Sequence, residues 1–382
     1  MKRFFSLALI TVLVLAILGA ASAQDAKTTD KKPETKEELI LGKTIGEWIT
    51  ILRTHDNPKF RRAALIALEA SNSAGRVGLA SIMETIEKDK EPRVRQEAVL
   101  LLGRLPSDTR GAGRLLVATL QNDKSEAVRE SAATAIANTY FKQASEYTSA
   151  LVEALKDAHP GTRAAVAGAL RNMGESAAPA FPAMFNAVKN PEEFPEVRVS
   201  GVHLLTRHDK ENAKLPPALL KIVGDPKDPL PLREAAIDGL ARLRADSPDV
   251  VAALCAVLSH TSLELRKSTA IALGAIGAKA KSGWPTIKER INLKNETDGS
   301  VRNHLIRLTG VLAKENPEAI SSLIDIAKVD STENRIAAIQ ELGELGARAK
   351  DTLPELTKIE SQDARAAIRD AAGKAITAIR GK

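Results

Sequence analysis

The most regular feature of the chain is an arginine that recurs with apolar or small residues at fixed distances around it. Ten arginines follow one another at intervals of 33 to 36 residues: Arg61, Arg95, Arg129, Arg163, Arg198, Arg233, Arg266, Arg302, Arg335 and Arg369. The positions one before, three after and seven after each arginine are mostly apolar or small. Such steps bring side chains to one face of an α-helix. The pattern therefore predicts that a helix begins near each arginine and buries this face.

The residues between the arginines predict a second helix in each repeat. Glycine follows three arginines by eleven residues and proline follows four by nineteen: Gly174, Gly277 and Gly346, and Pro182, Pro217, Pro285 and Pro354. Glycine at such a place ends a helix in the left-handed conformation, and proline suits a helix's first turn. An aspartate precedes most arginines by five or six residues: Asp56, Asp89, Asp123, Asp157, Asp228, Asp330 and Asp363. Each repeat is therefore expected to contain helix A, a turn with an aspartate, and helix B opened by the arginine.

This repeat resembles that of the HEAT-repeat family, including the short bacterial HEAT-like repeats of phycobilisome lyases. The resemblance rests on the order of Asp, Val-Arg, Ala and Ala-Leu-Gly, which is clearest in residues 86–104, 154–175, 262–278 and 330–347. It departs from the pattern at Thr162, Asn334 and His260, and in the longer repeat before Arg302. The resemblance implies an all-α protein, an α-solenoid or armadillo-like superhelix of about ten helical hairpins over residues 44–382. Such solenoids usually serve as platforms for partners, with no single activity.

The N-terminal residues predict export. Residues 1–23 have the pattern of a signal peptide: Lys2 and Arg3, an apolar stretch from Phe4 to about Ala20, and small residues before Gln24. The alternative is an uncleaved membrane anchor, although the apolar stretch is at the short end for spanning a bilayer. Residues 24–43 are rich in charge and predict a flexible linker. The mature protein is expected to be secreted or periplasmic, and no second stretch predicts a membrane span.

Composition narrows the class of partner. The net charge of +7 is modest for 382 residues, and aromatic residues make up only 3%. Nucleic-acid binding is therefore not expected, because stacking on bases needs aromatic side chains. The single cysteine, Cys255, lies within the apolar run Ala252–Leu258 and is expected to be a small core residue.

The ten arginines have two interpretations. They could form a binding stripe for an acidic polymer, or they could form a structural ladder. In the HEAT family that the chain resembles, this arginine and the turn aspartate join neighbouring repeats, so we favour the ladder. His55, His159 and His260 fall in the same turns and are expected to be structural too.

A separate set of residues is the candidate partner-binding surface. Helix B positions one, five and nine residues after the arginine share one face, which is expected to line the concave side. Polar residues of mixed charge gather there: His203, Arg207, Asp238, Arg242, Lys267, Asn303 and Arg307. A merely solvated face would have the same composition.

Motifs of catalysis and of metal or cofactor binding are absent from the sequence. It has no His-Glu-x-x-His run, no paired cysteines and no Gly-x-Ser-x-Gly, and Gly42-Lys43-Thr44 lacks the earlier glycine of a phosphate loop. We expect a non-enzymatic scaffold that binds proteins, with no cofactor. The alternatives are a chromophore-lyase-like accessory enzyme, which rests on the resemblance alone, and a binder of acidic envelope polymers, whose binding would weaken steeply with salt.

Overall fold

The computed structural model describes residues 39–70, 77–105, 111–139, 144–209, 211 and 213–381. The expected signal peptide, at 1–23, lies outside the described residues, as does most of the expected linker. The chain divides into two compact units, residues 1–172 and 173–382.

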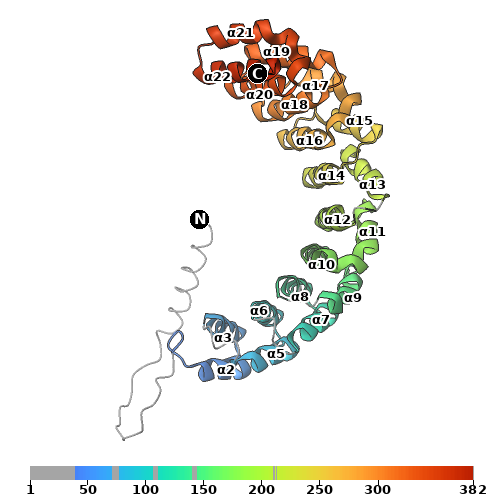
Figure 1. The fold of residues 1–382 in the computed structure, drawn as a ribbon. Helices are drawn as coiled ribbons and strands as arrows, with labels where there is room; N and C mark the ends of the chain where they lie inside the picture. The colour runs from blue at the N-terminus through green and yellow to red at the C-terminus, as the bar shows by residue number, and fades with distance from the viewer. Residues whose placement is uncertain are drawn as a thin grey trace. The chain divides into compact units, whose positions relative to one another are not determined.

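The first unit is a series of helical hairpins (Figure 1). Its A helices are α2 (Ile45–Thr54), α5 (Leu79–Lys88), α7 (Ala112–Asn122) and α9 (Ala144–Ala154). Its B helices are α3 (Pro58–Ala70), α6 (Pro92–Leu102), α8 (Glu126–Thr139) and α10 (Pro160–Met173). Each A helix is followed at once by its B helix, and successive B helices such as α6 and α8 pack against each other.

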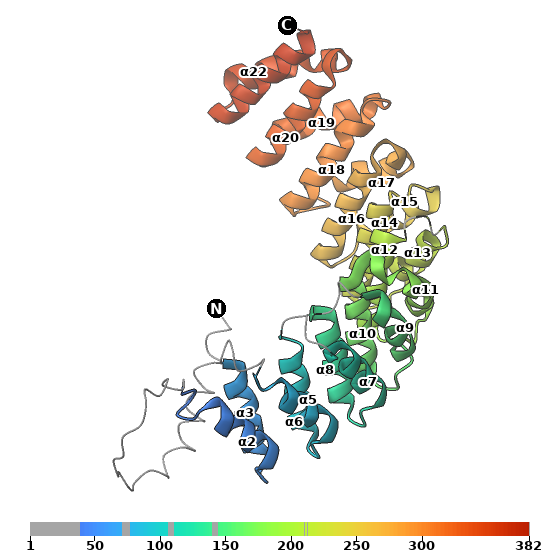
Figure 2. The same ribbon diagram turned by 60° about the horizontal axis from the view of Figure 1, so that its bottom comes forward.

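The second unit continues the same hairpin pattern. Its A helices are α11 (Phe181–Lys189), α13 (Leu215–Gly224), α15 (Pro248–Val257), α17 (Trp284–Arg290), α19 (Pro317–Val329) and α21 (Leu353–Gln362). Its B helices are α12 (Pro195–His208), α14 (Leu230–Leu243), α16 (Leu263–Ile276), α18 (Gly299–Leu312), α20 (Thr332–Glu344) and α22 (Ala366–Arg380). Within the unit the A helices form one layer and the B helices form another (Figure 2).

The predicted fold class is therefore confirmed: the chain is an α-solenoid of HEAT-type helical hairpins. The arginine that marks each repeat is the fourth residue of its B helix, as at Arg95 in α6 and Arg198 in α12. The stripe around it is buried in every hairpin, except that Phe60 is half-buried and stacks on His55 with ring centroids 4.3 Å apart. The helical periodicity thus predicted both the helices and their buried face.

The three predicted glycines do end their helices with positive φ, although Gly277, with ψ of −132°, lies outside the left-handed helical region. Gly174, Gly277 and Gly346 have φ of 61°, 65° and 55°, where a side chain would be strained. Each begins a seven-residue 3₁₀ segment that leads into the next A helix: η2 (Gly174–Ala180), η3 (Gly277–Gly283) and η4 (Gly346–Thr352). The sequence pattern did not predict these segments, because a 3₁₀ turn has no distinctive period over seven residues.

The two polar residues that directly precede an arginine in the apolar stripe are accommodated in different ways. Asn334 donates from Nδ2 to Asp330 Oδ1 at 3.1 Å and accepts at Oδ1 from Asn303 Nδ2 at 3.2 Å. Thr162 is fully buried, and within the described part of the chain its hydroxyl has no hydrogen-bond partner. Asparagine therefore contributes a small polar network at this position, whereas threonine contributes only its packing.

The end of the expected linker differs from the prediction for residues 24–43. Ile40 is buried and forms an isolated β-bridge with Lys43, and its carbonyl accepts a 2.7 Å hydrogen bond from Trp48 Nε1. Leu41 and Gly42 have φ of 50° and 81° and form the turn that joins Ile40 to Lys43. The Ile40 side chain and the Trp48 indole N–H therefore hold residues 40–43 against α2. The charged composition of the segment did not predict this contact.

The close approach of the end of α6 to α8 can be tested by adding a methyl group at Gly103. In the first unit a Cβ on Gly103 would lie 2.5 Å from Ala135 Cβ and 2.9 Å from Ala135 Cα, whereas a Cβ on Gly168 would meet nothing within 4 Å. We expect Gly103→Ala to lower the free energy of unfolding by about 2 kcal/mol through overpacking of α6 on α8. Gly168→Ala should raise it by about 0.5 kcal/mol, since alanine restricts the unfolded chain. Urea unfolding followed by circular dichroism measures both, and equal effects would contradict the close approach.

Candidate partner-binding face and arginine ladder

One arginine connects two consecutive turns, as Arg95 illustrates. Its Nε and Nη2 donate to the carboxylate of Asp123 in the next hairpin, both at 2.8 Å. Its Nη1 donates at 2.9 Å to the carbonyl of Asp89, in the turn of its own hairpin. Asp123 Oδ1 in turn accepts from the backbone N–H of Ser125 at 2.8 Å. A single guanidinium therefore fixes the turn before its own helix and holds the following turn through a two-bonded carboxylate.

The pairing of the arginine with a carboxylate of the next hairpin recurs in both units, although Arg198 and Arg335 donate from Nε to a carbonyl at the end of the preceding A helix. The pairs are Arg61–Asp89, Arg129–Asp157, Arg198–Asp228, Arg266–Glu296, Arg302–Asp330 and Arg335–Asp363. These arginine side chains, with Arg95, are only 3% to 16% exposed, so solvent screens the pairs little. The contacts support the structural interpretation of the ladder, whose weight in stability stays a prediction.

Sequence reasoning missed one member of the ladder, Glu296. Its side chain is almost fully buried and accepts from Arg266 at 2.6 and 3.1 Å and from Arg290 at 3.3 Å. A signal was present, because Glu296 precedes Arg302 by six residues, as Asp89 precedes Arg95. The repeat pattern specified an aspartate there, whereas the longer glutamate side chain fills the same position.

Arg233 and Arg369 vary the arrangement. Arg163 and Arg369 donate from Nη1 to the turn carbonyls of Asp157 and Asp363, at 2.8 and 2.7 Å. Arg233 instead lies with Nη1 3.3 Å from His260 Nε2. All ten arginines thus lie at equivalent places, but they do not all have a carboxylate opposite.

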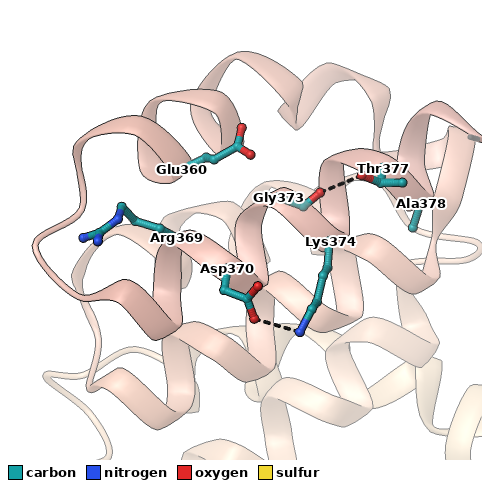
Figure 3. Close-up of a pocket in the computed structure, with 7 residues that line it drawn as sticks. All are labelled: Glu360, Arg369, Asp370, Gly373, Lys374, Thr377 and Ala378. Carbon is teal, nitrogen blue, oxygen red and sulfur yellow. Dashed lines mark hydrogen bonds and ion pairs between the residues drawn. The ribbon is translucent and has the colours of Figure 1, made fainter.

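Arg369 also lines an open hollow of about 570 Å³ on the last hairpin, with Glu360, Asp370, Gly373, Lys374, Thr377 and Ala378 (Figure 3). Lys374 pairs with Asp370 at 2.7 Å, and the Thr377 hydroxyl donates to the Gly373 carbonyl at 3.0 Å. No bond joins Arg369 to Glu360 in this view (Figure 3). Four of the seven lining side chains are charged and most of them are exposed, so a ligand there would remain largely in contact with water.

The candidate partner-binding residues lie on four successive B helices of the second unit. They are His203 and Arg207 on α12, Asp238 and Arg242 on α14, Lys267 on α16, and Asn303 and Arg307 on α18. The cations among them, Arg207, Arg242, Lys267 and Arg307, are exposed. The other three are half-buried, and Asn303 Oδ1 accepts from Arg307 Nε at 3.2 Å. The structure therefore places the seven residues in one helix layer; their role in binding stays a prediction.

Two further titratable residues, His304 and Glu341, neighbour these cations and were missed from sequence. Burial, with Lys267 and Arg307, lowers the pKa of His304. Burial and the charge of Glu344 raise the pKa of Glu341 to about 7 against the opposing effect of Arg307. Burial likewise raises the pKa of Asp238, although Arg242 opposes it.

A glycine on α18 makes room for the Glu341 carboxyl of α20. A Cβ at Gly310 would overlap Glu341 Oε2, so no larger residue fits there without moving the carboxyl. The sequence shows a glycine inside a helical segment, which signals a close approach. It does not show which side chain approaches, since Glu341 is 31 positions further along the chain.

No metal or membrane site emerges from the described residues. No three histidine, cysteine, aspartate or glutamate side chains within those ranges are grouped as metal ligands. None of the helices there is long and apolar enough to cross a bilayer. Cys255 is buried, and burial raises the pKa of its thiol to about 11, which makes it a poor nucleophile.

The ladder predicts a pH-dependent loss of stability. Burial would raise the pKa of Asp123, but hydrogen bonds from Arg95 and Ser125 outweigh it and lower the pKa below 3.8. A lowered pKa in the folded state gives stability that is present above the unfolded value and lost as pH falls through the folded value. Asp123→Asn should therefore cost about 3 kcal/mol at pH 7, because it leaves Arg95 without its counterion.

The measurement is urea unfolding of both proteins from pH 7 to pH 3, where the difference should shrink. Glu153→Gln is the matched control, since its pair with Lys156 is exposed and should contribute less than about 0.5 kcal/mol. An Asp123→Asn protein as stable as the parent at pH 7 would show that the ladder pair contributes nothing to the free energy of unfolding.

Glu341 predicts the opposite pH dependence. Its pKa is 4.5 in the unfolded chain and about 7 in the folded one, so the folded state binds more protons in this window and stability falls as pH rises through it. Glu341→Gln should raise the thermal midpoint at pH 8 by about 2 °C and leave it unchanged near pH 4.5. Glu360→Gln, on an exposed site, is the control; a pH-independent effect of Glu341→Gln would contradict the raised pKa.

Comparison with known proteins agrees with the repeat geometry. The family of HEAT repeats matches residues 45–137 and 113–193. No curated protein matches the chain. An engineered protein of known structure, 17% identical, aligns with a TM-score of 0.58 over 88% of this chain and 98% of its own.

Two karyopherins of known structure share the fold. Kap95p, studied with RanGDP, is 14% identical with a TM-score of 0.52, covering 88% of this chain and 55% of its own. Kap121p bound to Pho4p is 13% identical with a TM-score of 0.52, covering 88% and 45%. This chain therefore spans about half the length of these karyopherins, and at such identities the likeness concerns the fold alone. The narrower resemblance to phycobilisome lyases stays a prediction, whereas the match to HEAT repeats extends over residues 45–193.

Proposed function

We propose that this chain is an exported scaffold that binds a protein partner through the exposed face of its B helices in the second unit. This face, called here the helix-B face, comprises His203, Arg207, Asp238, Arg242, Lys267, Asn303 and Arg307. Export rests on the signal-peptide pattern of residues 1–23. The proposed role is binding and needs no chemical step.

The carrying observation is that half-buried acids lie among exposed cations on this layer. Among the described residues, none donates a hydrogen bond to the carboxyls of Asp238 or Glu341, although burial raises the pKa of both. Partly buried polar groups without partners reduce stability, so a face used only for solvation has no reason to keep them. Hydrogen-bond donors of a partner would pair with these two carboxyls. The exposed Arg207, Arg242 and Arg307 would pair with acidic side chains of the same partner.

The pairing of the ladder arginines supports the assignment of Arg207, Arg242 and Arg307 as the cations that contact a partner. The guanidinium groups of Arg198 and Arg302 are already bonded to Asp228 and Asp330 and have little exposed surface. Arg207, Arg242 and Arg307 have exposed side chains on the same helices. A partner approaching this layer would therefore meet these three guanidinium groups and not the ladder.

The karyopherins that share the fold support binding of proteins as the class of function. The structure of Kap121p is that of a complex with Pho4p, and Kap95p was studied with RanGDP. Successive hairpins place many side chains along one extended layer, which suits a protein surface better than a small molecule. The identity of the partner does not follow from this likeness.

The test reverses three charges. The combined substitutions Arg207→Glu, Arg242→Glu and Arg307→Glu should reduce capture of the native partner about 100-fold in cross-linking and mass spectrometry from the source cells, because repulsion replaces attraction. The control carries Arg348→Glu, Lys350→Glu and Lys358→Glu, an equal change of charge on exposed residues of η4 and α21. Far-ultraviolet circular dichroism checks that both variants fold.

The result distinguishes a specific face from general charge attraction. Loss in the first variant alone supports the helix-B face. Equal loss in both variants, together with steep salt dependence, would indicate an acidic polymer as the ligand and contradict the proposal. Unchanged capture in the first variant would also contradict it.

A further inference from the structure

One position of the ladder has a histidine where other positions have a carboxylate. Arg233 on α14 lies opposite His260, in the turn between α15 and α16, with 3.3 Å between Nη1 and Nε2. Arg233 is only 8% exposed, and its Nε donates to the Val223 carbonyl at 3.1 Å. Within the described part of the chain Arg233 takes part in no ion pair. Its positive charge is therefore nine-tenths buried without a counterion opposite it.

His260 cannot satisfy both groups that face it. Its Nδ1 lies 3.0 Å from the backbone N of Ser262, which donates, and its Nε2 faces the guanidinium of Arg233, which also donates. A neutral imidazole has one acceptor nitrogen and one N–H. In either tautomer, one N–H of the ring meets another N–H donor. With Nδ1 accepting from Ser262, the Nε2–H faces the guanidinium N–H donor to donor, and among the described residues no carboxylate is paired with either group.

The other pairs of the ladder identify the chemistry of that acceptor. Opposite Arg266, the carboxylate of Glu296 accepts from Nε and Nη2 and, through Oε1, from the backbone N–H of Asp298 at 3.0 Å. A carboxylate has enough acceptor sites to receive all these donors at once. The Arg233–His260 pair has the same arginine and the same turn N–H, but it lacks the carboxylate.

Two exposed leucines begin the two B helices nearest the pair in the chain, three residues before Arg233 and three residues after His260. Leu230 begins α14 and is 46% exposed, and Leu263 begins α16 and is 38% exposed. Proline begins α6, α10 and α12 at the equivalent places. Leu230 and Leu263 therefore lie on the two hairpins, α13–α14 and α15–α16, that are joined by the Arg233–His260 pair.

We infer that the Arg233–His260 pair, flanked by Leu230 and Leu263, is a binding site for an acidic side chain of a partner protein with apolar neighbours. The external carboxylate takes the role that Asp or Glu has in the other pairs, and it accepts from the guanidinium and from His260 Nε2–H. The leucines contact the apolar residues beside it. This site lies at the turns between A and B helices, apart from the helix-B face, and does not depend on the function proposed above.

The test uses the full chain and two blocked peptides, acetyl-Leu-Glu-Leu-amide and acetyl-Leu-Gln-Leu-amide. The chain has six histidines, so imidazole NMR spectra are simple, and the His260 signal is the one that His260→Asp removes. The Glu peptide should shift this signal saturably, with a dissociation constant about tenfold lower than that of the Gln peptide. Equal binding of the two peptides, or no shift, would overturn the inference.

His260→Asp supplies the missing carboxylate from within the chain. It should raise the thermal midpoint in the absence of peptide and abolish the stabilisation that the Glu peptide gives to the parent. Retention of that stabilisation, or a lower midpoint, would contradict the inference. The triple variant of the helix-B face should bind the Glu peptide like the parent; loss of binding there would assign the carboxylate to that face instead. A failure of one site is thus distinguished from a failure of the other.

Discussion

The structure depends on a guanidinium that lies between two consecutive turns. The arginine at the fourth position of a B helix bonds a carbonyl of its own turn, as Arg95 does, or of the end of the preceding A helix, as Arg198 does, and both side chains also reach the next turn. Turn carbonyls and N–H groups near buried helix ends need partners, because unpaired ones are costly. One planar side chain with five N–H donors supplies several of these bonds at once, which a lysine could not do.

The ladder also determines which charged side chains remain available to a partner. Paired arginines such as Arg95 and Arg302 are neutralised by Asp123 and Asp330, so their regular spacing contributes little to attraction at the surface. The groups left for recognition are those that the repeat does not require. In the proposed function they are the exposed cations of the helix-B face and the half-buried carboxyls of Asp238 and Glu341, whose pKa values are raised by burial and, for Glu341, by the charge of Glu344.

A repetitive structure makes a departure informative, because neighbouring repeats act as internal references. Arg233 is as buried as its counterparts and bonds a backbone carbonyl as Arg198 does, yet His260 faces it in place of an acid. In a non-repetitive protein, a buried arginine beside a histidine would have no such standard of comparison. Here the other pairs show what is missing and which chemistry would complete it.

The sequence by itself determined the local structure. The stripe around each arginine predicted the B helices, and Gly174, Gly277 and Gly346 predicted their ends, because both signals arise from residues less than four helical turns apart. The sequence also indicated that the arginines are structural, through resemblance to HEAT repeats. Only the tertiary structure decided the partners: Asp123 for Arg95, Glu296 for Arg266, and Glu341 beside Gly310. These contacts join residues about thirty positions apart, and their identity depends on how one hairpin stacks on the next, which helical periodicity does not specify.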